Sequence, residues 1–379
     1  MTVAFWVCTV ASGMLVWTWI AYPMLVCLLA RFSGSPASVA LHKLPSVTAI
    51  LATRDDPAAI AARVADFLAA DYPAELLNVV VGVDDATPER IAAVRATCNP
   101  ARVQVVVADE GGGKAAGLNA AVRNASGQVL VFSDVQQRFA ADAISVLVRR
   151  LSSDERLAAV GGALQLPSDL PSAAPRSPIE WYWVMERQLR AAEARLHSSV
   201  GLSGSIYALW RTAWVPLPAQ LILDDVWLPM RLVLDGQRVG YDLDALAWDA
   251  RSTTASAEKM RKVRTLTGNF QLMAWLPAVL LPFRNPIWVQ FISHKVLRLF
   301  TPWFLLAIAL AGVALVVVAV PAPLLSSLLL GAVCLVTLVM LAPATRATAI
   351  RGAQWGWSLQ LAILEATFNG ARGRWNVWR

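Results

Sequence analysis

Charged residues are scarce in this sequence. Asp, Glu, Lys and Arg make up 16% of its 379 residues, and hydrophobic residues make up 57%. In ordinary soluble proteins about a quarter of the residues are charged. Two runs, Thr2–Ala30 and Thr301–Thr345, contain no charged side chain at all. Each is long enough to cross a bilayer, which takes about 20 apolar residues, so the composition predicts a membrane protein.

The transmembrane helices follow from these two runs. A signal peptide would carry basic residues before its apolar core, and none precede the first run, so we expect a transmembrane helix over residues 1–31. The second run is too long for one helix and is broken at Pro321 and Pro323. We therefore expect a transmembrane hairpin over 301–345, with helices at 302–320 and 324–343.

Basic residues flank these helices on one side only. They are Arg31, Lys43, Lys295, Arg298, Arg346 and Arg351, whereas the turn at Pro321 carries none. The positive-inside rule then predicts a bacterial-type inner membrane protein with a cytoplasmic middle region and tail. The net charge of +7 fits contact with anionic lipid. No basic stretch is interleaved with aromatic residues, so nucleic acid is not an expected partner.

Cysteine and histidine are also rare. Three of the four cysteines (Cys8, Cys27 and Cys334) lie in the apolar runs, which argues against a disulfide framework. The three histidines are not spaced as metal ligands, and we assign them no chemistry. A Walker phosphate loop is missing too, because Ala108 and Ala115 stand where its first glycine and its Ser or Thr would be.

The middle of the chain alternates short apolar runs with helical patterns. Strands are expected at 46–52, 76–83, 102–108 and 127–133, with helices between them, one of them capped by Thr87 and beginning at Pro88. Such uniformly apolar strands are buried on both faces, as in a parallel sheet covered by helices. We expect an α/β domain over 44–255, interfacial helices over 256–300 and an amphipathic, basic tail over 346–379.

Every one of these strands ends in polar or charged residues. The strand ends read Thr53-Arg54-Asp55-Asp56, Asp84-Asp85, Glu110-Gly-Gly-Gly-Lys114 and Ser133-Asp134. Because ligands bind outside the carboxyl ends of parallel strands, these residues should meet in one crevice. Carboxylates opposite a lysine and a helix N-terminus suit an anion bridged by a divalent cation. A nucleoside diphosphate has this chemistry.

The order of the motifs resembles that of membrane-bound family 2 glycosyltransferases, whose catalytic domain has the GT-A fold with a Rossmann-like parallel core. Asp84-Asp85-Ala86-Thr87 resembles the family's Asp-Gly-Ser-Thr element, and Asp134-Val135-Gln136 resembles its Asp-x-Asp metal motif. Further along, "GLSGSIYALWR" (201–211) resembles the acceptor-side strand, and "LILDDVWLP" (221–229) resembles the element that contains the catalytic base.

The resemblance implies a role for each of these residues. Asp225 would be the base, with Asp224 beside it. The donor would be bound by Thr53, Asp55, Asp84, Lys114, Asp134 and Arg264. Mg²⁺ or Mn²⁺ would be held by Asp134 and Gln136, and the acceptor would face Ser203, Gly204 and Ser205. Trp181 and Trp183, in an amphipathic helix expected over 179–200, either line an acceptor groove or pack on the sheet.

Two departures from the family pattern affect the expected function. Gln136 replaces a metal-binding Asp, and an amide oxygen is a weaker ligand than a carboxylate. Processive synthases have Gln-x-x-Arg-Trp where this chain has Arg261-Lys262-Val263-Arg264-Thr265, which keeps the arginine and lacks the tryptophan. The implied reaction is therefore inverting transfer of one or a few sugars. The donor would be a nucleotide sugar, expected to carry UDP, and the acceptor a lipid-linked or polysaccharide hydroxyl at the inner membrane face. The alternatives are a processive polysaccharide synthase and a non-catalytic membrane partner that keeps the fold.

Overall fold

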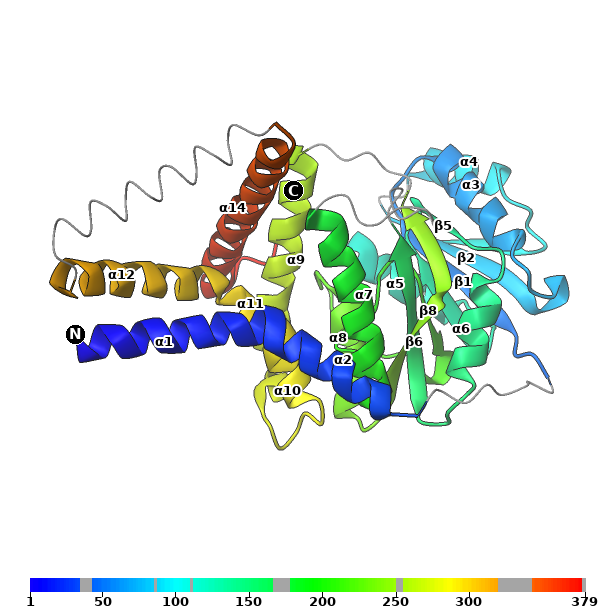
Figure 1. The fold of residues 1–379 in the computed structure, drawn as a ribbon. Helices are drawn as coiled ribbons and strands as arrows, with labels where there is room; N and C mark the ends of the chain where they lie inside the picture. Colours follow the sequence, from blue (N-terminus) through cyan, green and yellow to red (C-terminus); the bar gives the residue numbers. More distant parts are fainter. Residues whose placement is uncertain are drawn as a thin grey trace.

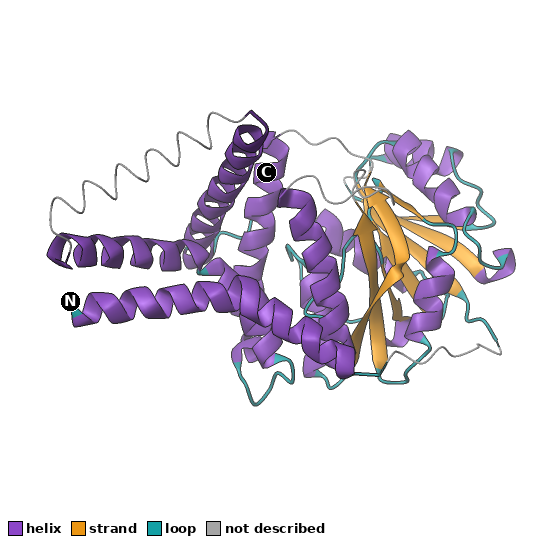
Figure 2. Cartoon of the chain, in the orientation of Figure 1, coloured by secondary structure: helices purple, strands orange, loops and turns teal. Residues whose placement is uncertain are grey.

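The chain is built around a mixed β-sheet with helices on both faces, and two apolar helices project from one side of this α/β layer (Figures 1 and 2). The computed structural model describes residues 1–34, 43–84, 87–109, 112–165, 178–249, 255–319 and 343–376. The expected second helix of the hairpin (324–343) therefore lies almost entirely outside the described residues.

The sheet has the strand order β3-β2-β1-β4-β7-β6-β8-β5. Its parallel half consists of the four expected strands, β1 (Val47–Thr53), β2 (Leu77–Val83), β3 (Val103–Val107) and β4 (Val129–Ser133). The rest consists of β5 (Gln137–Phe139), β6 (Leu157–Gln165), β7 (Tyr207–Trp210) and β8 (Arg238–Asp249), with β7 antiparallel to β4 and β6. The carboxyl ends of β1, β2 and β4 therefore share one edge.

Both faces of the sheet are buried, as the apolar strands predict. Ile50 and Leu130 belong to one hydrophobic cluster, and their neighbours Leu51 and Val131 belong to the cluster on the other face. The surrounding helices are α3 (Pro57–Leu68), α4 (Pro88–Ala96), α5 (Gly113–Arg123), α6 (Ala143–Leu151), α7 (Pro178–Leu196), α8 (Asp224–Leu234) and α9 (Ala255–Trp275). The expected cap is confirmed, since the Thr87 hydroxyl accepts a hydrogen bond from the Arg90 amide at 3.3 Å.

Helix α5 lies unusually close to the sheet. A Cβ atom on Gly82 of β2 would lie 2.3 Å from the carbonyl oxygen of Gly117 in α5, so only glycine fits there. This close approach holds the first turn of α5, which contains Lys114, at the carboxyl end of the sheet.

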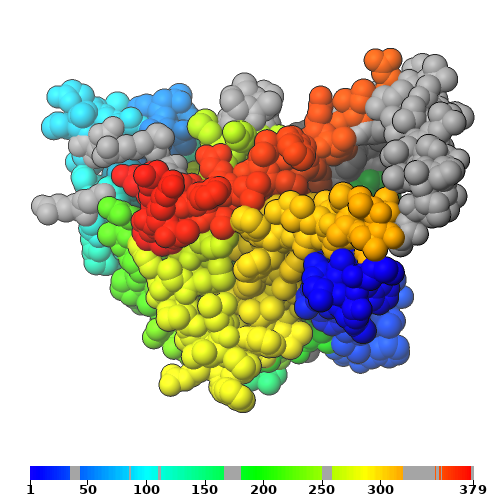
Figure 3. All heavy atoms as spheres, turned by 90° about the vertical axis from the view of Figure 1, so that its left-hand side faces the viewer, coloured from blue at the N-terminus to red at the C-terminus, as the bar shows by residue number. Residues whose placement is uncertain are grey.

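Two helical segments are long and apolar enough to cross a membrane, Thr2–Phe32 and Thr301–Val318. The first is formed by α1 (Thr2–Val16), a π-helical turn η1 (Trp17–Ala21) and α2 (Tyr22–Phe32), and the second lies in α12 (Thr301–Ala319). They lie side by side and extend away from the sheet (Figures 1 and 3). Large apolar side chains on them are exposed, such as Val10 at 56% and Val317 at 72%.

Short turns connect α9 to α12. They are η4 (Pro277–Leu280), α10 (Trp288–Phe291), η5 (Ile292–Val296) and α11 (Leu297–Leu299), and Phe283 between them is 99% exposed. The tail forms α14 (Pro343–Ala371), which packs along α9. Lys262 of α9 donates to Ser358 at 3.4 Å and stacks on Trp355 of α14. Helix α14 is not one of the two segments apolar enough to cross a membrane.

Candidate active site

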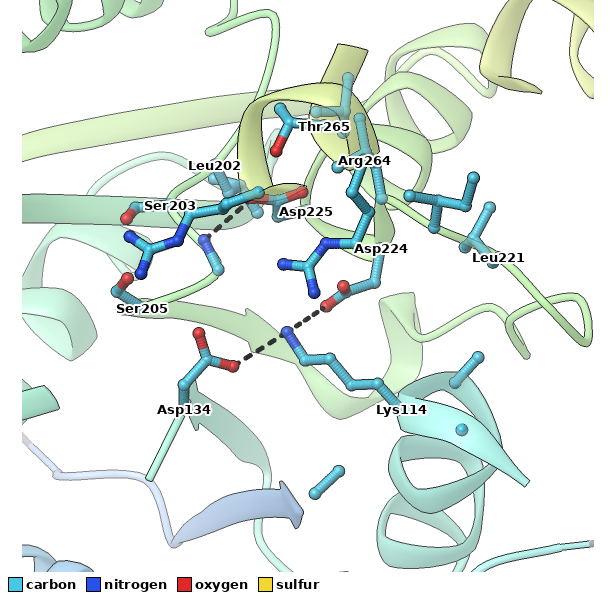
Figure 4. Close-up of a pocket in the computed structure, with 18 of the residues that line it drawn as sticks. Lys114, Asp134, Leu202, Ser203, Ser205, Leu221, Asp224, Asp225, Arg264 and Thr265 are labelled. Carbon is cyan, nitrogen blue, oxygen red and sulfur yellow. Dashed lines mark hydrogen bonds and ion pairs between the residues drawn. The ribbon is translucent and has the colours of Figure 1, made fainter. Parts of the chain in front are cut away.

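A pocket of about 860 Å³ opens at the carboxyl ends of β1, β2 and β4 (Figure 4). The predicted site residues that line it are Thr53, Asp55, Asp84, Lys114, Asp134, Gln136, Trp183, Ser203, Gly204, Ser205, Asp224, Asp225 and Arg264. Trp181 is 60% exposed and does not line the pocket, whereas Trp183 from the same helix does. The fold therefore brings together the strand ends and the two later motifs.

Lys114 lies between two carboxylates from distant parts of the chain. Its Nζ is 3.1 Å from Asp134 Oδ1, after β4, and 3.3 Å from Asp224 Oδ2, at the start of α8 (Figure 4). Burial lowers the pKa of Lys114, but the neighbouring acids outweigh burial, so the pKa is raised and the amine stays charged. Burial raises the pKa of Asp224, and Lys114 opposes this rise.

Asp225 is held by the loop before β7. The Gly204 amide donates to Asp225 Oδ2 at 3.2 Å, and the Leu202 amide donates to the Asp225 carbonyl at 2.8 Å. Asp224 and Asp225 both lie in the first turn of α8, where carboxylates are favoured by the helix dipole. Helix stabilisation alone does not explain why Asp224 pairs with Lys114 or why both acids line the pocket.

The glycine loop and the first two strand ends form the opposite wall. Gly112 and Gly113 have φ values of +64° and +84°, which favour glycine. A Cβ atom on Gly112 would lie 3.1 Å from Asp84 Oδ1, so the loop passes close to this acid. The Thr53 hydroxyl donates to Asp55 Oδ2 at 2.9 Å and accepts from the Asp55 amide at 2.9 Å. This wall is therefore ordered by local hydrogen bonds.

A divalent cation fits this site only together with a substrate. Within the described ranges, no group of three or more His, Cys, Asp or Glu side chains could hold a metal ion. Asp134 is 39% exposed at its side chain and faces the pocket, as does Gln136. Mg²⁺ is commonly bound by one or two carboxylates plus substrate phosphates. One carboxylate and one amide are consistent with an ion whose remaining ligands come from a diphosphate.

Sequence reasoning missed several residues that line the pocket. The first is Arg190, which lies seven residues after the predicted Trp183 on α7. Glu186 lies between them at helical spacing, and this pattern could have revealed that all three share one face of the helix. Lys295 lies in η5, outside every recognised motif. Trp375 follows α14, reaches the pocket and packs edge-on against Trp275 with ring centroids 6.4 Å apart. No local pattern predicts this return of the tail.

Comparisons with known proteins agree with this geometry. The model of the family "Glycosyltransferase like family 2" matches residues 45–268, more than half of the chain. An N-acetylglucosaminyltransferase of Rhizobium meliloti (strain 1021) is 28% identical over 203 residues, which are 52% of this chain and 47% of that protein. The matched part thus spans about half of that relative.

The fold is also found in a solved structure. The mannosyltransferase PcManGT from Pyrobaculum calidifontis, in complex with GDP-Man and Mn²⁺, superposes with a TM-score of 0.69 at 22% sequence identity. The match covers 96% of this chain and 99% of that chain, which confirms the expected GT-A fold. The chain therefore belongs to glycosyltransferase family 2 and has the GT-A fold.

Proposed function

We propose that this enzyme transfers one sugar, with inversion, from a UDP-sugar to a hydroxyl group of a lipid-linked or saccharide acceptor at the inner face of the membrane. The observation that carries the proposal is the pairing of Lys114 with Asp134 and Asp224, next to Asp225, in one pocket. This arrangement combines an ammonium group that can contact a leaving diphosphate with a carboxylate that can act as a base.

The donor half of the pocket suits a diphosphate. An ammonium group has three N–H donors, and Lys114 directs two of them at carboxylates, so a third can reach a phosphate. Arg264 and the first turn of α5, which has no capping side chain, add further positive potential. A divalent ion bound with the donor would be held by Asp134 and Gln136 and would stabilise charge on the leaving diphosphate.

The acceptor half of the pocket suits proton removal from an alcohol. The Gly204 amide orients Asp225 through Oδ2, which leaves Oδ1 available to accept the proton of an acceptor hydroxyl. As Asp225 removes this proton, the acceptor oxygen attacks the anomeric carbon of the sugar from the side opposite the diphosphate. Ser203 and Ser205 lie beside it and can hydrogen-bond to a sugar or headgroup.

Membrane attachment is supported by the two projecting apolar segments and by the basic residues that flank them. The pocket is joined to the base of these segments, because Lys295 on its wall lies six residues before α12. An acceptor held in the bilayer could therefore reach Asp225 without leaving the membrane surface. The exposed Phe283 and the tryptophan-containing turns before α12 suit the headgroup layer.

The test is the variant Asp225→Asn, which keeps the shape and removes the base. We expect transfer to fall by at least about 100-fold, since general bases contribute about 10²–10⁴, while donor affinity stays unchanged. Asp235→Asn at the C-terminal cap of the same helix is the matched control, because Asp235 is exposed and pairs only with Arg231 at 3.1 Å among the described residues. Equal transfer rates for wild type and Asp225→Asn would refute the proposal.

A further inference from the structure

A second cluster of charged side chains lies between α7 and the segment that leads into α12. Glu186 Oε1 accepts hydrogen bonds from Arg190 at 3.2 Å and lies 2.9 Å from His294 Nε2. Glu186 Oε2 accepts from Arg298 at 2.8 Å, and His294 Nδ1 lies 2.9 Å from Glu193 Oε1. Glu186, Glu193 and His294 are all at least 97% buried.

Positive charge exceeds negative charge in this cluster. Arg190, Arg298 and Lys295 face the carboxylates of Glu186 and Glu193. Both ring nitrogens of His294 also face a carboxylate oxygen. Three cationic side chains thus face the two carboxylates of the cluster. A buried excess charge is costly unless a counter-ion pairs with it.

The excess charge faces the acceptor half of the pocket. Arg190 and Lys295 line the pocket together with Asp225, and Arg190 donates to the Leu202 carbonyl at 3.1 Å, beside the loop that holds Asp225. Lys295 forms no ion pair within the described part of the chain. The pKa of Lys295 is lowered to about 8, mainly by burial and also by Arg190 and Arg298, while Glu186 and Glu193 oppose this shift.

We propose that Arg190 and Lys295 bind a phosphate ester of the acceptor, close to the hydroxyl group that Asp225 deprotonates. This inference rests on the proposed transferase function and specifies its acceptor. Glu186 is a positioning residue, because it fixes the guanidinium of Arg190 while His294 and Arg298 compensate its charge.

The cluster lies next to the first apolar segment. Two tryptophans of the first apolar segment bond to the turns around Lys295: Trp17 donates to Ser293 at 3.0 Å, and Trp19 donates to Thr301 at 3.2 Å. The phosphate can therefore come from a lipid headgroup or from a soluble phosphorylated acceptor, and the experiment has one arm for each.

The first experiment is protection of Lys295 from an amine-reactive reagent, applied to the full-length protein near pH 8 and read by peptide mass spectrometry. The probes are glycerol 3-phosphate and phosphatidylglycerol in micelles of a maltoside detergent, which carries no phosphate. The controls are glycerol, the detergent alone and potassium chloride at equal ionic strength. We expect at least about fivefold slower labelling of Lys295 with a phosphate probe, since binding holds the amine in its charged, unreactive form. Lys259, 56% exposed at its side chain, should label equally in all mixtures.

Protection by glycerol 3-phosphate indicates a soluble phosphate ester, and protection by phosphatidylglycerol alone indicates a lipid. Protection by neither, or equal protection by potassium chloride, overturns the inference. The labelling needs no turnover, so its result is independent of the Asp225→Asn test. Lys295 can lack protection while Asp225→Asn abolishes transfer, and Lys295 can be protected while Asp225→Asn transfers normally.

The second experiment compares Lys295→Met with Lys295→Arg. Donor hydrolysis without acceptor is measured first in each variant and serves as that variant's own reference rate. A phosphate probe bound next to Asp225 should alter this hydrolysis in the wild type. In Lys295→Met we expect the half-maximal effect at a probe concentration at least about tenfold higher than in the wild type, which corresponds to a loss of about 1.4 kcal/mol of binding free energy. In Lys295→Arg we expect the midpoint to return to the wild-type concentration. An unchanged midpoint in Lys295→Met contradicts the inference.

Discussion

Single charges at short range determine the chemistry of the site. Lys114 contacts Asp134 and Asp224, and without its ammonium group two carboxylates would face each other across the pocket. Removing one partner of an ion pair is most destabilising where the remaining charge is buried, as it is for Asp224. Lys114 therefore joins distant segments of the chain at the pocket, and we propose that it also contacts the anionic donor.

The variant Lys114→Met should lower the affinity for the nucleoside diphosphate by at least about tenfold, since one charge-assisted contact contributes about 1.5–3 kcal/mol. Calorimetric titration with UDP measures this. Lys262→Met is the control, because Lys262 pairs with Glu258 at 3.0 Å on the outer helices. Equal UDP affinity in wild type and Lys114→Met would show that Lys114 does not contact the donor.

The raised pKa of Asp224 predicts a pH dependence of stability. Between its ordinary pKa of 3.8 and its higher pKa in the fold, the folded state binds more protons than the unfolded chain, so this group's contribution to stability decreases as pH rises. In Asp224→Asn this titration is absent. The Tm of Asp224→Asn minus that of the wild type should therefore increase with pH above about 4. A Tm difference that is constant or falls with pH would contradict the raised pKa.

Helix-to-helix packing determines where the two acids of α8 lie. Gly268 of α9 touches the residue that precedes them: a Cβ atom added there would lie 2.4 Å from Leu223 Cγ and 2.9 Å from Ile222 Cγ2. The side-chain amide of Gln271, also on α9, accepts from the Ile222 amide at 2.9 Å. Helix α9 therefore supports the residues that lead into Asp224 and Asp225, and it also carries Arg264.

The variant Gly268→Ala should lower both Tm and transfer activity. Overpacking costs about 1–3 kcal/mol, which exceeds the gain of about 1 kcal/mol from replacing a helical glycine. Gly356→Ala on α14 is the matched control, because nothing lies within 4 Å of its added Cβ atom. Thermal melting and transfer assays measure both effects. A Tm of Gly268→Ala at or above that of the wild type would show that α9 can shift freely.

At the scale of the whole molecule, the pocket and the apolar segments form one functional unit. The pocket lies at the strand ends of the α/β layer, where we propose that the donor binds, and Lys295 on its wall belongs to the turns that lead into α12. The projecting segments are seen in Figure 1. This arrangement suits an acceptor that remains in the membrane while its headgroup enters the pocket.

Membrane insertion should depend on the exposed apolar surface of α12. Val313→Glu and Val317→Glu replace side chains that are 63% and 72% exposed, and a charge within a spanning helix costs about 2.5–3.5 kcal/mol. We expect a smaller fraction of each variant to float with vesicles. Val107→Glu on β3, 49% exposed on the α/β layer, should float like the wild type. Equal flotation of all three variants would argue against insertion of α12.

Local patterns in the sequence determine the parallel half of the sheet and the donor side of the pocket. Apolar runs form β1 to β4, and the carboxyl ends of neighbouring parallel strands share an edge, so Thr53, Asp84 and Asp134 had to come close together. The cap at Thr87 and the apolar segments are equally local, because they depend on neighbouring residues and on composition alone.

Only the tertiary structure decided the rest. The contact of Lys114 with Asp224, the order of β5 to β8, and the arrival of Arg190, Lys295 and Trp375 at the pocket join residues far apart in the chain. Such contacts depend on how helices pack on the sheet and on one another, and no spacing in the sequence encodes that geometry. The charge excess around Glu186 likewise exists only once α7 and the turns before α12 are packed together, since burial is what makes those charges costly.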